Sequence, residues 1–176
     1  MPKGPFVASE FVPTKFSSAA DKADFGNALL NFLDADCTQE LFTKKLYQRL
    51  SMTFGHIAHY DRTGFYDIWF TRVPHKAAFI EKTLRWPCHG DPEFTFSDVE
   101  YAIQQVVRQR NYLARFELRA ADELRAAELK DLERLEAKYR NQKQPESAAT
   151  ANEPAASAMS GAVSASPDLP IQISLF

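Results

Sequence analysis

Cysteine is scarce in this chain, and so are long apolar runs. Only Cys37 and Cys88 occur among the 176 residues, which is typical of a protein kept in a reducing compartment. No apolar stretch approaches the roughly eighteen consecutive residues that a membrane-spanning helix needs. The start of the chain also lacks the charged, apolar and cleavage regions of a secretory signal. We therefore expect a cytoplasmic protein that makes no membrane contact.

Neither sign of charge is in clear excess. The chain carries 21 Lys and Arg residues against 23 Asp and Glu residues, for a formal net charge of −2. A balanced chain exerts no long-range attraction on nucleic acid or on an anionic membrane. We therefore expect any contact with DNA to be indirect or weak.

Recognisable catalytic motifs are missing as well. The sequence has no Gly-rich phosphate loop, no nucleophile elbow and no paired acidic metal motif. His56 and His59 with Cys88 and His89 are residue types that bind zinc, but the chain has no cysteine pair at the close spacing of zinc sites. Cys37 lies beside a predicted helix start, where a thiol pKa can fall, yet no base is identifiable for it. We expect a protein that is not an enzyme and has no cofactor and no metal.

What is present favours a helical domain. Hydrophobic residues make up 45% of the chain and include 14 Phe, enough for a real core. Ser17 or Ser18 can cap a first helix that ends near Asp36. Its apolar residues recur at three- and four-residue intervals, and they are Phe25, Leu29, Leu30, Phe32 and Leu33. A second helix is expected to begin at Thr38 and to run to Gly55.

The middle of the chain is less regular. From Tyr60 to Phe70 we expect an irregular aromatic stretch with a turn over residues 61–64 and a buried Trp69. Pro74 then favours the start of another helix, which would reach Trp86.

The longest predicted helix starts at a Ser97 cap and continues unbroken to Gln142. Its second half, from Glu117 to Tyr139, is rich in Ala, Leu, Glu and Arg, with opposite charges three or four positions apart. Such a helix either projects from the core or pairs with a helix of a second protein, although its heptad pattern is irregular. We predict a mainly α fold in which a small helical domain, residues 1–143, ends in this long helix.

The composition changes abruptly at Gln144. Residues 144–170 are rich in Ala, Ser and Pro and contain no aromatic residue, Lys or Arg. Such a segment cannot bury enough apolar surface to offset the entropy lost on ordering. We expect a disordered tether, followed by a short peptide over residues 171–176.

That peptide contains the sequence Gln-Ile-Ser-Leu-Phe, formed by Gln172, Ile173, Ser174, Leu175 and Phe176. It resembles the motif with which bacterial replication and repair proteins bind the DNA sliding clamp, the beta subunit of the polymerase, whose usual form is Gln-Leu-Ser/Asp-Leu-Phe. The resemblance implies that the Gln hydrogen-bonds in the clamp pocket while the Leu-Phe pair fills an apolar hole. Burial of Leu175 and Phe176 would supply roughly 1.5–3 kcal/mol each. The peptide could instead pack on its own domain as a short strand, or serve as a degradation signal.

The resemblance implies an adaptor or regulator that a tether holds at the clamp during DNA replication or repair, as small proteins of phages and mobile elements often are. A nucleic-acid-binding module recruited by the clamp is the alternative. His59, Tyr60, Arg62 and Arg72 are its candidate contacts, because basic and aromatic groups stack on bases and hold phosphates. Packing of these aromatic residues in a core is the simpler interpretation. A third alternative is a scaffold in which the long helix pairs with another protein.

A second basic group lies along the long helix. It is formed by Arg108, Arg110, Arg115, Arg119 and Arg125. Acidic residues alternate with it from Glu117 to Glu128, so we expect a solvated helix face.

Overall fold

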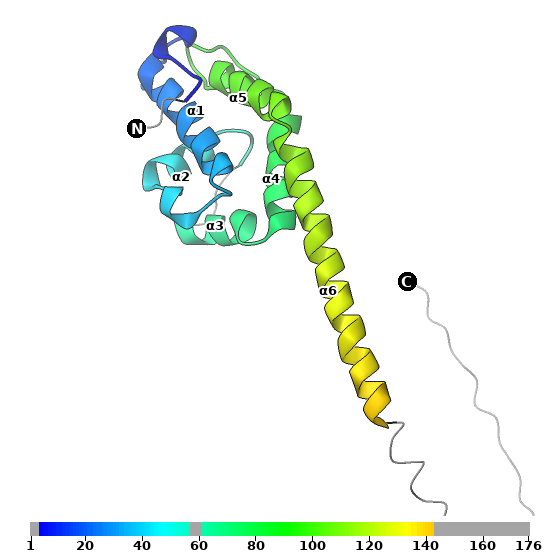
Figure 1. Ribbon diagram of the computed structural model, residues 1–176. Coiled ribbons are helices and arrows are strands. Elements are labelled where there is room, and N and C mark those ends of the chain that lie inside the picture. Colours follow the sequence, from blue (N-terminus) through cyan, green and yellow to red (C-terminus); the bar gives the residue numbers. More distant parts are fainter. Residues whose placement is uncertain (1–3, 57–60, 143–176) are drawn as a thin grey trace, which may run out of the picture. The chain divides into compact units, whose positions relative to one another are not determined.

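The computed structural model describes residues 4–56 and 61–142, and all regular secondary structure within them is helical, as the spacing of apolar residues predicts (Figure 1). The elements, in chain order, are η1 (Ala8–Glu10), α1 (Ala19–Asp34), η2 (Gln39–Leu41), α2 (Lys44–Leu50), α3 (Arg62–Phe70), α4 (Val73–Arg85), α5 (Ser97–Gln109) and α6 (Tyr112–Gln142). Contacts divide the chain into two units, Met1–Leu132 and Glu133–Phe176, and the hydrophobic core belongs to the first.

Helix α1 starts where the sequence predicts. The Ser18 hydroxyl accepts a hydrogen bond from the Asp21 amide at 3.1 Å, and the Asp21 carboxylate accepts from the Ser18 amide in return. This reciprocal cap satisfies amide groups that have no partner inside the helix. The predicted apolar face is buried, and Leu29 and Phe32 are both 0% exposed. The capping residue is therefore Ser18 rather than Ser17.

The helix predicted from Thr38 is divided in two, so that prediction was wrong. A single 3-10 turn, η2, is followed by α2, whose N-cap is Thr43; its hydroxyl accepts from the Leu46 amide at 3.2 Å. Between the two elements Phe42 turns inward and is 3% exposed. From this position the Phe42 ring packs against Phe65 and Phe70 in the core.

The stretch predicted to be irregular is a regular helix, α3. Asp61 caps it by accepting from the Gly64 amide at 2.7 Å, so the residues expected to form a turn are its first turn. Asp is a favoured N-cap residue, so Asp61 is the local sequence signal for the start of α3. Trp69 is half-buried and packs against the core, whereas Phe65 and Phe70 are buried. Helix α4 begins with Val73 and Pro74 and ends before Trp86, close to its predicted bounds.

The long C-terminal helix is also interrupted, contrary to the prediction. Helix α5 ends at Gln109, and Asn111 takes a left-handed backbone conformation with φ of 52° before α6 begins. Asn tolerates this region better than most residues. The break redirects the chain so that Tyr112 and Phe116 enter the core, at 0% and 2% exposure. Ser97 is the first residue of α5 rather than its cap, and its hydroxyl donates to the Gly90 carbonyl at 2.8 Å.

A network of aromatic rings forms the centre of the core. The Phe70 ring lies 4.8 Å from that of Phe32 on α1 and 4.8 Å from that of Phe79 on α4, measured between centroids. Phe42 adds a ring 5.4 Å from Phe70. Edge-to-face and tilted pairs of this kind add to the hydrophobic gain of burial. Phenylalanine therefore joins α1, α3 and α4 through one cluster.

No helix in the described residues is both long enough and apolar enough to cross a membrane. Helix α6 has the length, but acidic and basic side chains recur in each of its turns.

Candidate functional site

The predicted clamp-binding residues lie outside the described part of the chain. This holds for Gln172, Ile173, Ser174, Leu175 and Phe176 and for the predicted tether before them. The resemblance to the clamp-binding motif therefore stays a prediction from sequence.

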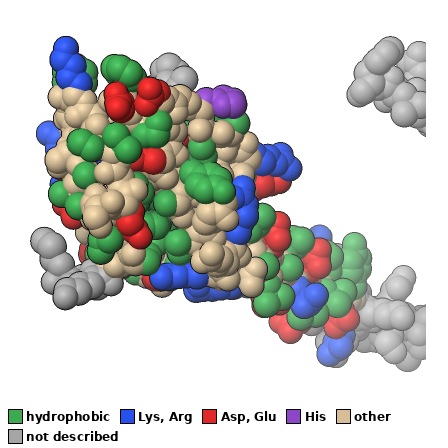
Figure 2. All heavy atoms as spheres, turned by 90° about the horizontal axis from the view of Figure 1, so that it is seen from above, with side chains coloured by type: hydrophobic (Ala, Val, Ile, Leu, Met, Phe, Trp, Pro, Cys, Tyr) green, Lys and Arg blue, Asp and Glu red, His purple; other side chains and the backbone are tan. Residues whose placement is uncertain are grey.

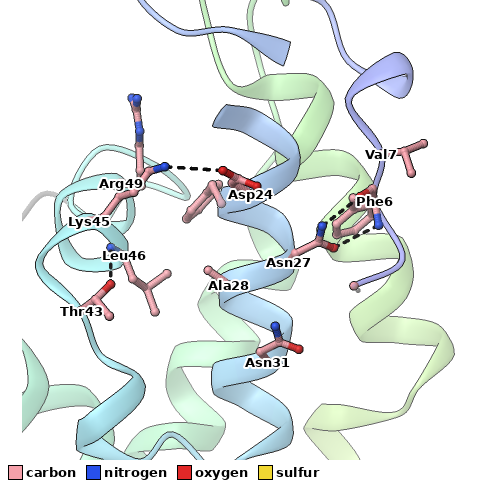
Figure 3. Close-up of a pocket in the computed structure, with 12 residues that line it drawn as sticks. Phe6, Val7, Asp24, Asn27, Ala28, Asn31, Thr43, Lys45, Leu46 and Arg49 are labelled. Carbon is pink, nitrogen blue, oxygen red and sulfur yellow. Dashed lines mark hydrogen bonds and ion pairs between the residues drawn. The ribbon is translucent and has the colours of Figure 1, made fainter. Parts of the chain in front are cut away.

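The described residues do form a groove, of about 630 Å³, between α1, α2 and the N-terminal segment (Figure 3). Its apolar surface includes Phe25 and Leu46, which are 3% and 2% exposed. Part of its polar lining comes from one face of α1, where Asp24, Asn27 and Asn31 recur at three- and four-residue spacing. That spacing is the sequence signal for the groove, and it lies on the same helix as the apolar stripe that packs in the core. The rest of the polar lining comes from Thr43, Lys45 and Arg49, at the start of α2 and within it.

Asn27 fixes the N-terminal wall of the groove. Its side-chain amide donates to the Phe6 carbonyl at 2.9 Å, and its side-chain oxygen accepts from the Phe6 amide at 3.0 Å (Figure 3). The Phe6 ring packs closely over Gly26, since a Cβ added there would lie 2.6 Å from Phe6 Cδ2. One side chain thus pairs both backbone groups of Phe6, as a neighbouring strand would.

The charged side chains on the rim of the groove have partners within the chain. Lys45 Nζ lies 3.5 Å from an Asp21 oxygen and 3.7 Å from an Asp24 oxygen. Arg49 donates to the Ser17 hydroxyl at 3.0 Å, and its guanidinium lies over the Phe96 ring at 4.7 Å. The Lys45 ion pairs are exposed and therefore weak, whereas Arg49 is half-buried. The groove therefore suits apolar surface better than a strongly charged ligand, and its lining residues bring no nucleophile and base together.

The candidate nucleic-acid contacts are only partly described. His59 and Tyr60 lie outside the described residues, while Arg62 and Arg72 flank α3 at opposite ends, roughly 15 Å apart along the helix. The Arg62 guanidinium donates to the Phe42 carbonyl at 3.4 Å. Acidic, basic and hydrophobic side chains are interspersed on the face shown in Figure 2. Arg62 and Arg72 are thus separated by the length of α3.

Two arginines of the second basic group are structural. Arg110 lies 3.0 Å from an Asp34 oxygen, and Arg119 donates to Asp36 at 3.0 Å. Lys76 also donates to Asp36, at 3.2 Å. Burial alone would raise the pKa of Asp36, but hydrogen bonds from Arg119 and Lys76 outweigh burial and lower it. All five arginines of the group are exposed, as expected of a solvated helix face, and Arg110 and Arg119 in addition join α6 and its preceding turn to the end of α1.

Of the residues considered for metal or thiol chemistry, His56 and Cys37 are buried, Cys88 is half-buried and His89 is exposed, while His59 lies outside the described residues. The His56 ring is 2% exposed and stacks on Phe79 at 4.5 Å, and burial with the charge of Lys82 lowers its pKa to about 3. Burial raises the pKa of Cys37 to about 12 and that of Cys88 to about 11, the reverse of an activated thiol. Among residues 4–56 and 61–142 no three His, Cys, Asp or Glu side chains gather as a metal site would require.

Two buried charged side chains, Lys22 and Glu100, were not predicted from the sequence. Lys22 has a fully buried side chain whose Nζ lies 2.8 Å from Asp98 and 2.8 Å from the Pro92 carbonyl. The Glu100 carboxylate accepts from the Phe54 amide at 2.8 Å and from the Trp86 indole at 3.0 Å. Burial raises the pKa of Glu100, although these two hydrogen bonds oppose the rise. Both groups tie loops to helices, and neither lines the groove.

Comparison with protein families, with curated proteins and with solved structures found no match to this chain.

Proposed function

We propose that this chain binds a bacterial DNA sliding clamp through Gln172, Ile173, Ser174, Leu175 and Phe176, and acts there as a non-enzymatic adaptor or regulator. The observation that carries the proposal is the pentapeptide itself. Gln172, Leu175 and Phe176 match the usual form of the clamp-binding motif, and Ile173 replaces a leucine of similar size. Two large apolar anchors and one directional amide are the features that let a short peptide bind without a large interface.

The described domain supports an adaptor more than an enzyme or a DNA-binding module. Its thiols and its buried histidine have pKa values shifted away from reactivity. Its basic side chains are paired with acidic ones or spread over separate elements. In this proposal the clamp supplies the location on DNA, and the domain acts through protein contacts.

The direct test is calorimetry with a peptide covering Leu169 to Phe176 and a purified bacterial sliding clamp. We expect micromolar affinity, which corresponds to about −8 kcal/mol. Replacing Leu175 and Phe176 together by Ala should abolish binding, because both anchors are lost. Gln172→Ala should weaken binding less.

A matched control removes two apolar side chains from the same segment but outside the motif, through Leu169→Ala with Ile171→Ala. This control peptide should keep most of the affinity. The full chain and the chain without residues 172–176 should behave like the matching peptides in a pull-down with the clamp. The proposal is wrong if the wild-type peptide does not bind, or if the Leu175 and Phe176 variant binds equally well.

A further inference from the structure

Helix α6 carries an apolar face that no other described element covers. Exposed fractions are 66% for Leu118, 61% for Leu124, 56% for Leu129, 53% for Leu132, 40% for Leu135 and 63% for Tyr139. Helix α6 is one helix from Tyr112 to Gln142, so residues three and four apart lie on the same side of it. We call the outer face of α6 the set of residues that are separated alternately by four and three positions, which is the spacing of a heptad repeat. They are Ala114, Leu118, Ala121, Arg125, Glu128, Leu132, Leu135 and Tyr139.

The outer face points away from the core. Phe116 is buried, and Leu118, two residues later, is turned from it by about 160° at 100° per residue. Leu113 and Ala120 are partly buried beside Phe116, whereas every residue from Ala121 to Arg140 is exposed. The outer face can therefore meet a second helix without disturbing the core contacts of α6.

We propose that a second copy of this chain covers the outer face, with the two α6 helices antiparallel. In one alignment Leu118 lies opposite Leu135 of the second copy, Ala121 opposite Leu132, and Ala114 opposite Tyr139. Two-fold symmetry repeats each pair, as expected for an isologous dimer. Leucine meets leucine, and each larger side chain meets an alanine, so the layers interlock without a gap. This proposal is independent of the clamp.

The centre of this alignment explains why charged residues interrupt the apolar face. Arg125 lies opposite Glu128 of the second copy, and Glu128 lies opposite its Arg125. A charged pair at the centre of a helix pair stabilises little but selects register and orientation. Leu124 and Leu129 flank this layer and restrict the access of water to it.

The flanks of the outer face are complementary in the same alignment. In an antiparallel pair each flank meets the same flank of the other helix. Arg115 then lies near Glu136 of the second copy, and Glu117 lies near its Lys138. All four side chains are exposed in the single chain. Complementary flanking charges of this kind set partner choice and direction in paired helices.

A parallel pair with the same outer face would be repelled. It would place Arg125 against Arg125, Glu128 against Glu128, and Glu117 near Asp122 of the other copy. Like charges opposite each other cost free energy, more so when they are partly desolvated. The charge pattern is thus self-complementary in the antiparallel direction only.

Within its own helix Arg125 pairs with Asp122, and this pair competes only weakly with a pair between Arg125 and Glu128 of a second copy. Arg125 lies 3.4 Å from Asp122, and both side chains are largely exposed, at 72% and 61%. Such pairs contribute about 0.3–0.5 kcal/mol at most. Arg125 can therefore turn to Glu128 of a second copy at little cost.

Sedimentation equilibrium of the full chain, over a range of concentrations, tests the proposal. We expect a monomer–dimer equilibrium. Arg125→Glu alone and Glu128→Arg alone should each raise the dissociation constant at least about tenfold, because each leaves two like-charged central layers. The double variant Arg125→Glu with Glu128→Arg should restore the wild-type constant, because it exchanges the two charges. Lys130→Glu makes the same change of charge outside the outer face and should have little effect.

Any of three results would overturn the proposal. A chain that stays monomeric at about 100 µM does not pair as proposed. A dimer that neither single charge reversal weakens uses another surface. Single reversals that the double variant fails to rescue exclude the antiparallel alignment. Far-ultraviolet circular dichroism of each variant confirms that the helix content, and hence the fold, is unchanged.

Discussion

Helices α5 and α6 both carry apolar residues along one side, yet their environments differ completely. In α5, Val99, Ile103 and Val107 are at most 1% exposed, because α1 and α4 pack against them. In α6, Leu124, Leu129 and Leu132 are more than half exposed. An apolar stripe therefore indicates that a helix has a face to cover, but it does not identify what covers that face. Substitutions inside the core should therefore have larger effects on stability than substitutions on the exposed part of α6.

The largest effect is expected at the aromatic core. Phe79→Ala should lower the free energy of unfolding by about 3–5 kcal/mol, because it removes a ring that contacts His56, Trp69 and Phe70 and leaves a cavity. Urea denaturation followed by circular dichroism measures the change. A loss below about 1 kcal/mol would show that Phe79 is not packed as described.

A somewhat smaller effect is expected from the buried ion pair. Asp98→Ala should destabilise the fold by about 3 kcal/mol, because it leaves the Lys22 charge buried without its carboxylate partner. Glu81→Ala removes the surface pair between Glu81 and Arg85 and should cost less than about 1 kcal/mol. Equal effects in the two urea titrations would contradict the buried position of Lys22.

Protonation of His56 should destabilise the core at mildly acidic pH. Its pKa is about 3 in the folded chain against 6.5 when unfolded, so only the unfolded chain takes up this proton as the pH falls below 6.5. The loss should reach about 2 kcal/mol at pH 5 and continue to increase toward pH 3.

The pH dependence of unfolding of His56→Phe isolates this contribution. That variant should lack the loss, whatever its absolute stability. His89→Phe, at an exposed position, should keep the wild-type pH dependence. A similar pH dependence in wild type and His56→Phe would show that the buried imidazole is not the cause.

The smallest effect is expected on α6. Leu124→Ala should change the free energy of unfolding by less than about 0.5 kcal/mol in dilute, monomeric protein, because the side chain is exposed and Ala is a good helix former. The measurement is urea denaturation at a concentration where sedimentation shows a monomer. A loss comparable to that of Phe79→Ala would mean that Leu124 is covered within a single chain.

Much of the fold was predictable from local signals. The Ser18 cap, the apolar spacing of α1 and the proline at the start of α4 specified elements close to those observed. The errors occurred where local signals conflicted. Periodicity favoured one helix through Phe42 and one through Asn111, but the chain breaks at both places, and at Asn111 the change of direction lets Tyr112 and Phe116 enter the core.

The groove was less accessible to prediction than the helices. Asn27 is an ordinary surface residue by its spacing, and only the return of the N-terminal segment makes it a partner for Phe6. The buried partners of Lys22 and Glu100 are likewise distant in the chain, so no local pattern could show them.

The sequence by itself determined the helical class, the apolar faces and the pentapeptide from Gln172 to Phe176. These depend on residue type and on spacing within a few turns. Only the tertiary structure decided where helices break, which charges are buried, and that α5 is covered while the outer face of α6 is not. The reason is physical: propensity and capping act between neighbours in the chain, whereas burial depends on which distant segments fill the same space.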